Sequence, residues 1–166
     1  MPVKYKSRND LPEEIRSQVV DILNQRLAEG IDLQYQAKQA HWNAKGRNFI
    51  GFHELMDKVA EFAEESVDLI AERATALGGI ANGTVRDASN NSSLEEYPHE
   101  IVTTTEHVEA ISNAIAKFGK QLRESIDETD ELQDADTSDM LTDISRENDK
   151  YLWMVEAHTQ DEKKIA

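Results

Sequence analysis

The chain has 166 residues, with 33 acidic side chains against 18 basic ones, and its formal net charge is −15 at pH 7. Such a charge argues against a protein whose main partner is a polyanion. The absence of cysteine excludes disulfides and thiolate metal sites, and no apolar run is long enough to cross a membrane. We therefore expect a soluble, cytoplasmic protein with no membrane partner.

Helical spacing of apolar residues predicts a first pair of long helices. The first is expected to open near Asp10, where Asp10-Leu11-Pro12-Glu13 is similar to a capping box, and to run to about Asn43. The second carries apolar residues from Phe52 to Leu69 and is expected to stop at Gly78-Gly79, a C-cap signal.

A long polar connection should follow, over residues 82–97, with a short helix at about 85–92. A third long helix is expected to start near Pro98, and a fourth near Asp136-Thr137. The fold class is therefore all-α. We expect one helical domain over residues 10–160, between short tails at 1–9 and 161–166.

Five nitrogen and oxygen donors are concentrated between residues 41 and 72: His41, His53, Asp57, Asp68 and Glu72. Imidazole and carboxylate donors suit a redox-active iron or a zinc ion. On one helix, positions 53, 57, 68 and 72 fall at about 0°, 40°, 60° and 100°, which is one narrow stripe. The pattern indicates a candidate metal site.

The two ends of the stripe lie too far apart for one chain to build that site. His53 and Asp68 are separated by about 22 Å along a straight helix, whereas metal–ligand bonds are roughly 2 Å long. A second copy of the helix, running antiparallel about a twofold axis near Phe62, would bring the ends together. The composite site would take His41, His53 and Asp57 from one subunit and Asp68 and Glu72 from the other. The alternative is that these residues form a solvated helix face.

The same residues carry a resemblance to a family. The segment H-W-N-x-x-G-x-x-F-x-x-x-H-x-x-x-D from His41, followed by D-x-x-x-E-R from Asp68, resembles the signature of the Dps family of miniferritins. The likeness resumes at Asp136–Thr142 and again at Asn148–Met154. It implies a ferritin-like four-helix bundle, a hollow dodecamer, intersubunit ferroxidase centres and storage of oxidised iron.

The resemblance also implies roles for particular residues. His41 and His53 would be nitrogen ligands of a di-iron centre, Asp68 and Glu72 its carboxylate ligands, and Asp57 an outer partner or a weak ligand of the second iron. Hydrogen peroxide would be the preferred oxidant, with oxygen as the alternative, and zinc would compete for the site. Asp134 and Asp139 would line an iron-entry pore, whereas helix capping is the alternative role for acidic residues at that place.

The sequence departs from the family pattern in its capacity to bind DNA. The N-terminus offers only Lys4, Lys6 and Arg8, and Lys163-Lys164 at the other end follow Asp161-Glu162. We therefore expect weak or absent DNA binding at physiological salt. Two other functions stay open at this point: a nucleoid-type DNA-binding protein with a vestigial metal site, and a helical interaction module without metal.

Overall fold

The computed structural model describes residues 3–160, and this part of the chain folds into five helices with no strand. The helices are α1 (Glu13–Asn43), α2 (Phe49–Ala76), α3 (Val85–Asn91), α4 (Thr104–Glu131) and α5 (Ala135–Glu156). The predictions of an all-α fold and of a short helix in the crossover are confirmed. No helix in this part of the chain is long and apolar enough to span a membrane.

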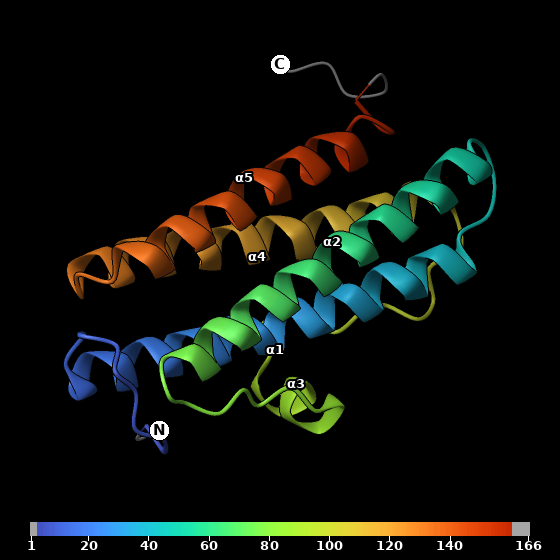
Figure 1. The fold of residues 1–166 in the computed structure, drawn as a ribbon. Helices are drawn as coiled ribbons and strands as arrows, with labels where there is room; N and C mark the ends of the chain where they lie inside the picture. The colour runs from blue at the N-terminus through green and yellow to red at the C-terminus, as the bar shows by residue number, and fades with distance from the viewer. Residues whose placement is uncertain (1–2, 161–166) are drawn as a thin grey trace.

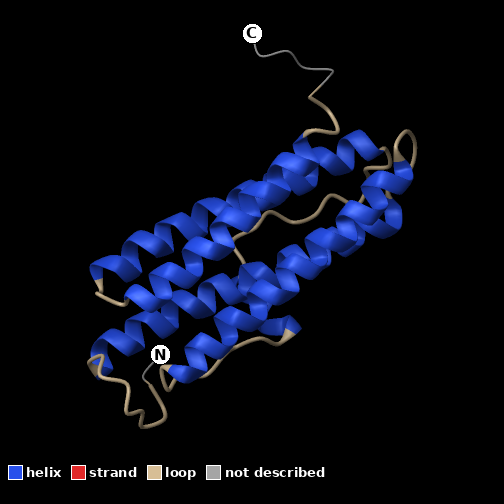
Figure 2. Cartoon of the chain, turned by 45° about the horizontal axis from the view of Figure 1, so that its top comes forward, coloured by secondary structure: helices blue, strands red, loops and turns tan. Residues whose placement is uncertain are grey.

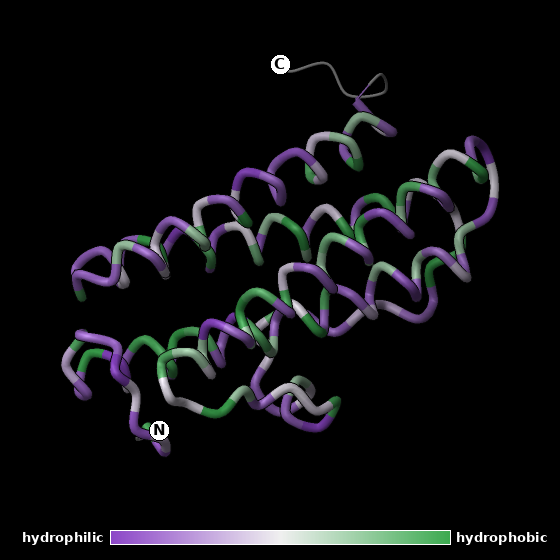
Figure 3. Tube along the Cα trace, viewed as in Figure 1, coloured by the Kyte–Doolittle hydropathy of each residue, from purple (hydrophilic) through white to green (hydrophobic). Residues whose placement is uncertain are grey.

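The four long helices form a bundle from two antiparallel pairs, α1 with α2 and α4 with α5 (Figure 1). The short helix α3 lies against α1, outside the bundle, as Figures 1 and 2 both show. Apolar and polar residues alternate along each long helix (Figure 3), and the buried residues of each helix recur at spacings of three or four, as expected for helices with one face in the core. Phe52, Met56, Phe118 and Leu122 are among the fully buried side chains of the resulting core.

One predicted helix start is wrong, and one predicted helix cap does not form. The helix expected near Pro98 begins at Thr104, because Thr103 and Glu106 form a reciprocal capping box at that point. The box expected at Asp10 does not form: Pro12 occupies the N-cap of α1 and makes no side-chain hydrogen bond. The other predicted boundaries agree with the structure to within about three residues.

The crossover between α2 and α4 is held to the bundle by hydrogen bonds to buried polar residues. The Ser93 hydroxyl donates a hydrogen bond of 2.7 Å to the carboxylate of Glu29, a fully buried residue of α1. Further along, the hydroxyl oxygen of Tyr97 lies 2.5 Å from Nδ1 of His107, a buried histidine in the first turn of α4. Burial raises the pKa of Tyr97 and lowers the pKa of His107. Both side chains are therefore held neutral.

The N-terminal segment is docked onto the end of α2. The backbone N–H groups of Lys4 and Tyr5 both donate hydrogen bonds to the carbonyl of Gly78, at 3.0 and 3.1 Å. Gly78 has a φ of 86°, and a Cβ at this position would meet the Tyr5 carbonyl oxygen at 2.5 Å. Glycine is therefore required at this contact, both by its left-handed backbone and by the lack of space.

Candidate metal centre

A short turn brings the two histidines of the candidate site together. His41 lies in the last turn of α1 and His53 in the first turns of α2. The chain reverses direction between them through residues 44–48, where Gly46 and Asn48 have φ values of 113° and 57°. The two imidazole rings stack with their centroids 3.6 Å apart and an interplanar angle of 21°.

Each histidine is oriented by the backbone of the other. Nδ1 of His41 donates a hydrogen bond of 2.8 Å to the carbonyl oxygen of His53, and Nδ1 of His53 donates one of 2.9 Å to the carbonyl oxygen of His41. A carbonyl can only accept, so the proton of each neutral ring must reside on Nδ1. Both Nε2 atoms therefore keep a lone pair, which is the state that a metal-ligating histidine needs.

Asp57 lies beside this pair, one turn after His53 on α2. Its Oδ1 atom accepts a hydrogen bond of 2.7 Å from Nζ of Lys38 and lies 3.2 Å from Nδ1 of His41. The hydrogen bond from Lys38 is the main cause of the lowered pKa of Asp57, which keeps this carboxyl group ionised. Asp57 thus contacts the proton-bearing nitrogen of His41, and its charge is already balanced by a cation.

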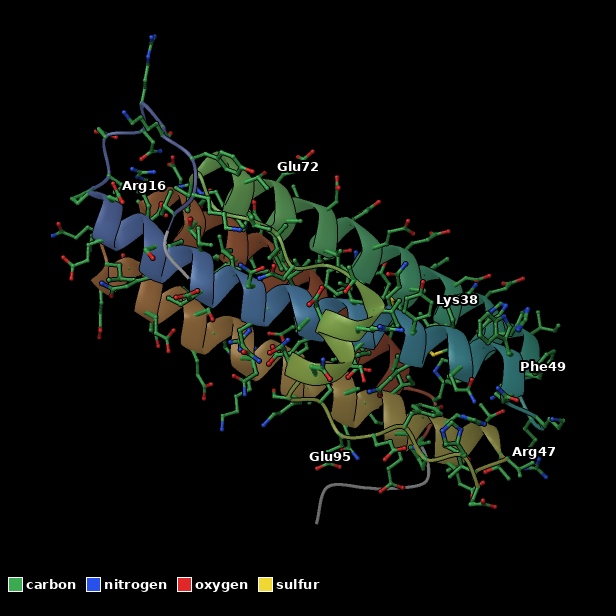
Figure 4. All side chains as sticks on the ribbon, turned by 90° about the horizontal axis from the view of Figure 1, so that it is seen from below. Arg16, Lys38, Arg47, Phe49, Glu72 and Glu95 are labelled. Carbon is green, nitrogen blue, oxygen red and sulfur yellow. The ribbon has the colours of Figure 1, made fainter. Side chains whose placement is uncertain are left out.

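Asp68 and Glu72 lie toward the other end of α2, and both are exposed. Figure 4 shows Glu72 far along the molecule from Lys38 and Phe49, which mark the histidine end. Within residues 3–160, no three acidic or histidine side chains come close enough to share one metal ion. A single chain therefore presents the five donors as two separate sets, His41, His53 and Asp57 at one end and Asp68 and Glu72 at the other.

A groove of about 790 Å³ lies beside Asp68, between α1, α2 and the start of α3. Four carboxylates contribute charge to its wall, those of Glu61, Glu64, Glu65 and Asp68. The apolar part of the wall consists of Leu27, Ile31, Tyr35, Val67, Ala71 and Val85. Tyr35 is 55% exposed and Val85 is 69% exposed, so two large exposed side chains line the same groove. Asp68 thus lies on a surface that also exposes apolar side chains, as protein–protein interfaces do.

The two candidate pore residues differ in their surroundings. Asp134 is buried; it is the N-cap of α5, where it accepts hydrogen bonds from Thr137, and it pairs with Arg73 at 2.7 Å. The capping role is therefore observed for Asp134, and its carboxylate faces partners in its own chain. Asp139 is exposed on the first turns of α5, so lining a pore stays a prediction for this residue.

Lys38 is a further residue beside the candidate site that was not predicted from the sequence, although its spacing from His41 relates the two residues. Lys38 precedes His41 by three residues on α1 and so lies on the same helix face. Its ammonium group also lies 5.9 Å from the centroid of the Trp42 ring. Of the histidines left unassigned, His107 is held by Tyr97, His158 lies at a separate pocket, and His99 is exposed.

Comparisons with known proteins agree with this fold. The ferritin-like domain family matches residues 20–165. A DNA protection during starvation protein from Agrobacterium fabrum is 41% identical over 157 residues, which cover 95% of this chain and 97% of the relative. The structure of Mycobacterium smegmatis Dps in a tetragonal form has a TM-score of 0.91 at 29% identity and covers 98% of this chain and 99% of its own. DpsC from Streptomyces coelicolor has a TM-score of 0.90 at 26% identity, over 98% and 95% of the two chains.

Proposed function

The chain belongs to the Dps family of ferritin-like proteins, and on that premise we propose that it is a ferroxidase that stores iron in a hollow shell. Fe²⁺ is the substrate. Two subunits would share each centre, with His41 and His53 from one and Asp68 and Glu72 from the other, and the assembled shell would be a dodecamer. The observation that carries the proposal is the pair of hydrogen bonds from Nδ1 of each histidine to the backbone carbonyl of the other. These bonds leave a lone pair on both Nε2 atoms, with which they can bind a metal ion.

The surface around Asp68 supports the sharing of the site. An antiparallel copy of α2 would bring Asp68 and Glu72 toward the His53 end of its partner. It would also cover Tyr35 and Val85, the exposed apolar side chains that line the groove beside Asp68. The placement of the carboxylates and the apolar groove thus favour the same twofold pairing.

Each residue would have a definite part in the reaction. Neutral Nε2 atoms and ionised carboxylates bind Fe²⁺, and the carboxylates favour the harder Fe³⁺ that leaves for the mineral. With hydrogen peroxide as oxidant, two Fe²⁺ ions lose one electron each, and the peroxide takes up two electrons and two protons to become two molecules of water. This stoichiometry consumes Fe²⁺ and peroxide together, which would protect the cell from oxidative damage.

Measurements of solution mass and of Fe²⁺ oxidation test this function together. The iron-free protein should form a closed oligomer, and Fe²⁺ oxidation followed optically should be faster with peroxide than with oxygen. A monodisperse monomer of about 19 kDa, the chain mass being 18.8 kDa, would remove the basis for a shared centre. An oxidation rate no faster than that of Fe²⁺ in buffer would contradict the ferroxidase activity itself.

Replacing Lys38 by methionine should strengthen binding of a second metal ion at each centre. The ammonium group of Lys38 neutralises Asp57, so its removal leaves a carboxylate free to attract a cation. We expect an anaerobic titration with Fe²⁺ to approach two ions per centre in the variant at concentrations where the unmodified protein binds one. Lys58→Met, which removes an exposed lysine of α2, is the control. Equal numbers of bound Fe²⁺ ions in all three proteins would contradict the idea that Lys38 weakens binding of the second ion.

DNA binding should be weak or absent, and two observations support this. The chain carries a net charge of −15, and the segment with Lys4 and Lys6 is tied to Gly78 rather than extended. A gel shift at about 0.15 M salt should therefore show no complex at micromolar protein. A tight complex under those conditions would favour the alternative, a nucleoid-type DNA-binding protein.

A further inference from the structure

A pocket of about 350 Å³ lies at the end of the bundle, where α2 and α4 begin and α5 ends. Its wall consists of Arg47, Asn48, Thr104, Thr105, Val108, His158 and Thr159. No carboxylate lines it, although the chain has 33 acidic residues and four other pockets in residues 3–160 each have acidic side chains in their walls. The pocket thus stands out as a positively charged site on an acidic protein.

The loop that carries Arg47 is fixed to the start of α4. Lys45 donates a backbone hydrogen bond of 3.1 Å to the carbonyl of Val102, and its own carbonyl accepts bonds from the backbone N–H and the hydroxyl of Thr104 at 2.9 and 3.1 Å. Figure 4 shows Arg47 at the same end of the molecule as Phe49, the first residue of α2. The loop is therefore held in place beside the threonines of the pocket.

His158 reaches the pocket with its ring orientation fixed. Its Nδ1 atom donates a hydrogen bond of 3.0 Å to the carbonyl of Met154, and the ring packs edge-on against Phe52 with centroids 5.9 Å apart. Its Nε2 atom has no hydrogen-bond partner in the described part of the chain. The acidic residue in the same turn of α4, Glu106, has its carboxylate engaged by the N–H groups of Val102 and Thr103.

We propose that this pocket binds a tetrahedral oxyanion of the phosphate class. The Arg47 guanidinium can form charge-assisted hydrogen bonds with such an ion, while Asn48, Thr105 and His158 offer further polar groups at the same wall. The positive end of α2, which has no acidic residue in its first turn, adds to the attraction. The ion has two natural sources, inorganic phosphate and the backbone of a nucleic acid, and this site is separate from the iron-binding residues.

Binding of inorganic phosphate to the assembled, iron-free protein in chloride buffer tests the proposal by calorimetry. We expect saturable binding that weakens at least about tenfold in Arg47→Ala, since the variant loses a charged hydrogen-bond donor. Arg86→Ala, which removes an exposed arginine of α3, is the matched control and should bind like the unmodified protein. The mass of each variant shell confirms assembly, and His158→Ala provides a second variant of the pocket.

A short single-stranded oligonucleotide distinguishes the two sources. Binding of the oligonucleotide that is displaced by phosphate and lost in Arg47→Ala would identify a nucleic-acid backbone as a ligand. Phosphate binding without oligonucleotide binding would identify the free ion. Absence of saturable phosphate binding up to about 10 mM, or equal affinity in Arg47→Ala and the unmodified protein, would overturn the proposal. Neither result depends on whether the protein oxidises iron.

Discussion

Replacing His53 by alanine is expected to lower the initial rate of Fe²⁺ oxidation by at least about a hundredfold while the shell still assembles. The variant loses one nitrogen ligand of the proposed centre and also the ring that stacks on His41. Even the loss of a hydrogen bond to a ligating histidine costs about 10- to 100-fold in metal affinity or activity. Asp68→Ala should have a similar effect, since Asp68 is exposed and its removal leaves the core intact.

A different histidine provides the control for this experiment. His99 is exposed in the crossover, so His99→Ala should keep the oxidation rate of the unmodified protein. Rates are compared optically with equal concentrations of assembled protein and the same oxidant. Unchanged rates in both His53→Ala and Asp68→Ala would show that the centre lies elsewhere.

Replacing Arg26 by methionine is expected to destabilise the fold by about 3–5 kcal/mol, which is the usual cost of leaving a buried charge without its partner. Nε of Arg26 lies 2.8 Å from the carboxylate of the fully buried Glu29, and its guanidinium also donates hydrogen bonds to the Gln121 carbonyl and the Ser125 hydroxyl. The thermal midpoint should fall by on the order of 10 °C at fixed protein concentration.

The pH dependence of this loss follows from the pKa of Glu29. Burial raises that pKa, and the charge of Arg26 opposes the rise. Without Arg26 the pKa should rise further, so the carboxyl group takes up a proton more readily in the folded than in the unfolded state. A group whose pKa is higher in the folded than in the unfolded state contributes less to stability as the pH increases. The destabilisation by Arg26→Met should therefore be smaller at about pH 5 than at neutral pH.

An exposed arginine serves as the comparison for Arg26. Arg123 pairs with Asp149 at 3.1 Å, and both side chains are more than half exposed, so Arg123→Met should cost at most about 1 kcal/mol. Replacing both Arg26 and Glu29 by methionine should recover most of the loss, since no charge is then buried alone. Equal thermal midpoints for Arg26→Met and Arg123→Met would contradict the importance of the buried pair.

The sequence predicted the helices wherever apolar periodicity and strong end signals coincide. The stop at Gly78-Gly79 agrees with the end of α2 at Ala76. The start of α4 was misplaced because Pro98 is also a helix-start signal, and only the contacts of Thr103 and Glu106 show which signal operates. The docking of Lys4 and Tyr5 on Gly78 joins segments far apart in the chain, so local sequence patterns could not predict it.

For the candidate site, spacing selected the five candidate ligands but did not predict their immediate surroundings. The separation of His53 from Asp68 could be predicted from the sequence, because the rise per residue of an α-helix alone determines it. The mutual Nδ1–carbonyl bonds of His41 and His53 depend on the path of residues 44–48, which periodicity does not describe. The pairing of Lys38 with Asp57 joins α1 to α2, and the spacing of Lys38 and His41 on α1 does not predict it.

A mixed-shell experiment tests the shared centre most directly. His53→Ala and Glu72→Ala subunits, each inactive alone, are dissociated, mixed in equal amounts and reassembled, and mass measurement confirms the mixed shells. Random pairing makes about half of the twofold pairs mixed, and one of the two centres in such a pair has no lesion. About a quarter of the oxidation rate of the unmodified protein should therefore return if the centres act independently. No recovery of activity in confirmed mixed shells would contradict a centre built from two subunits.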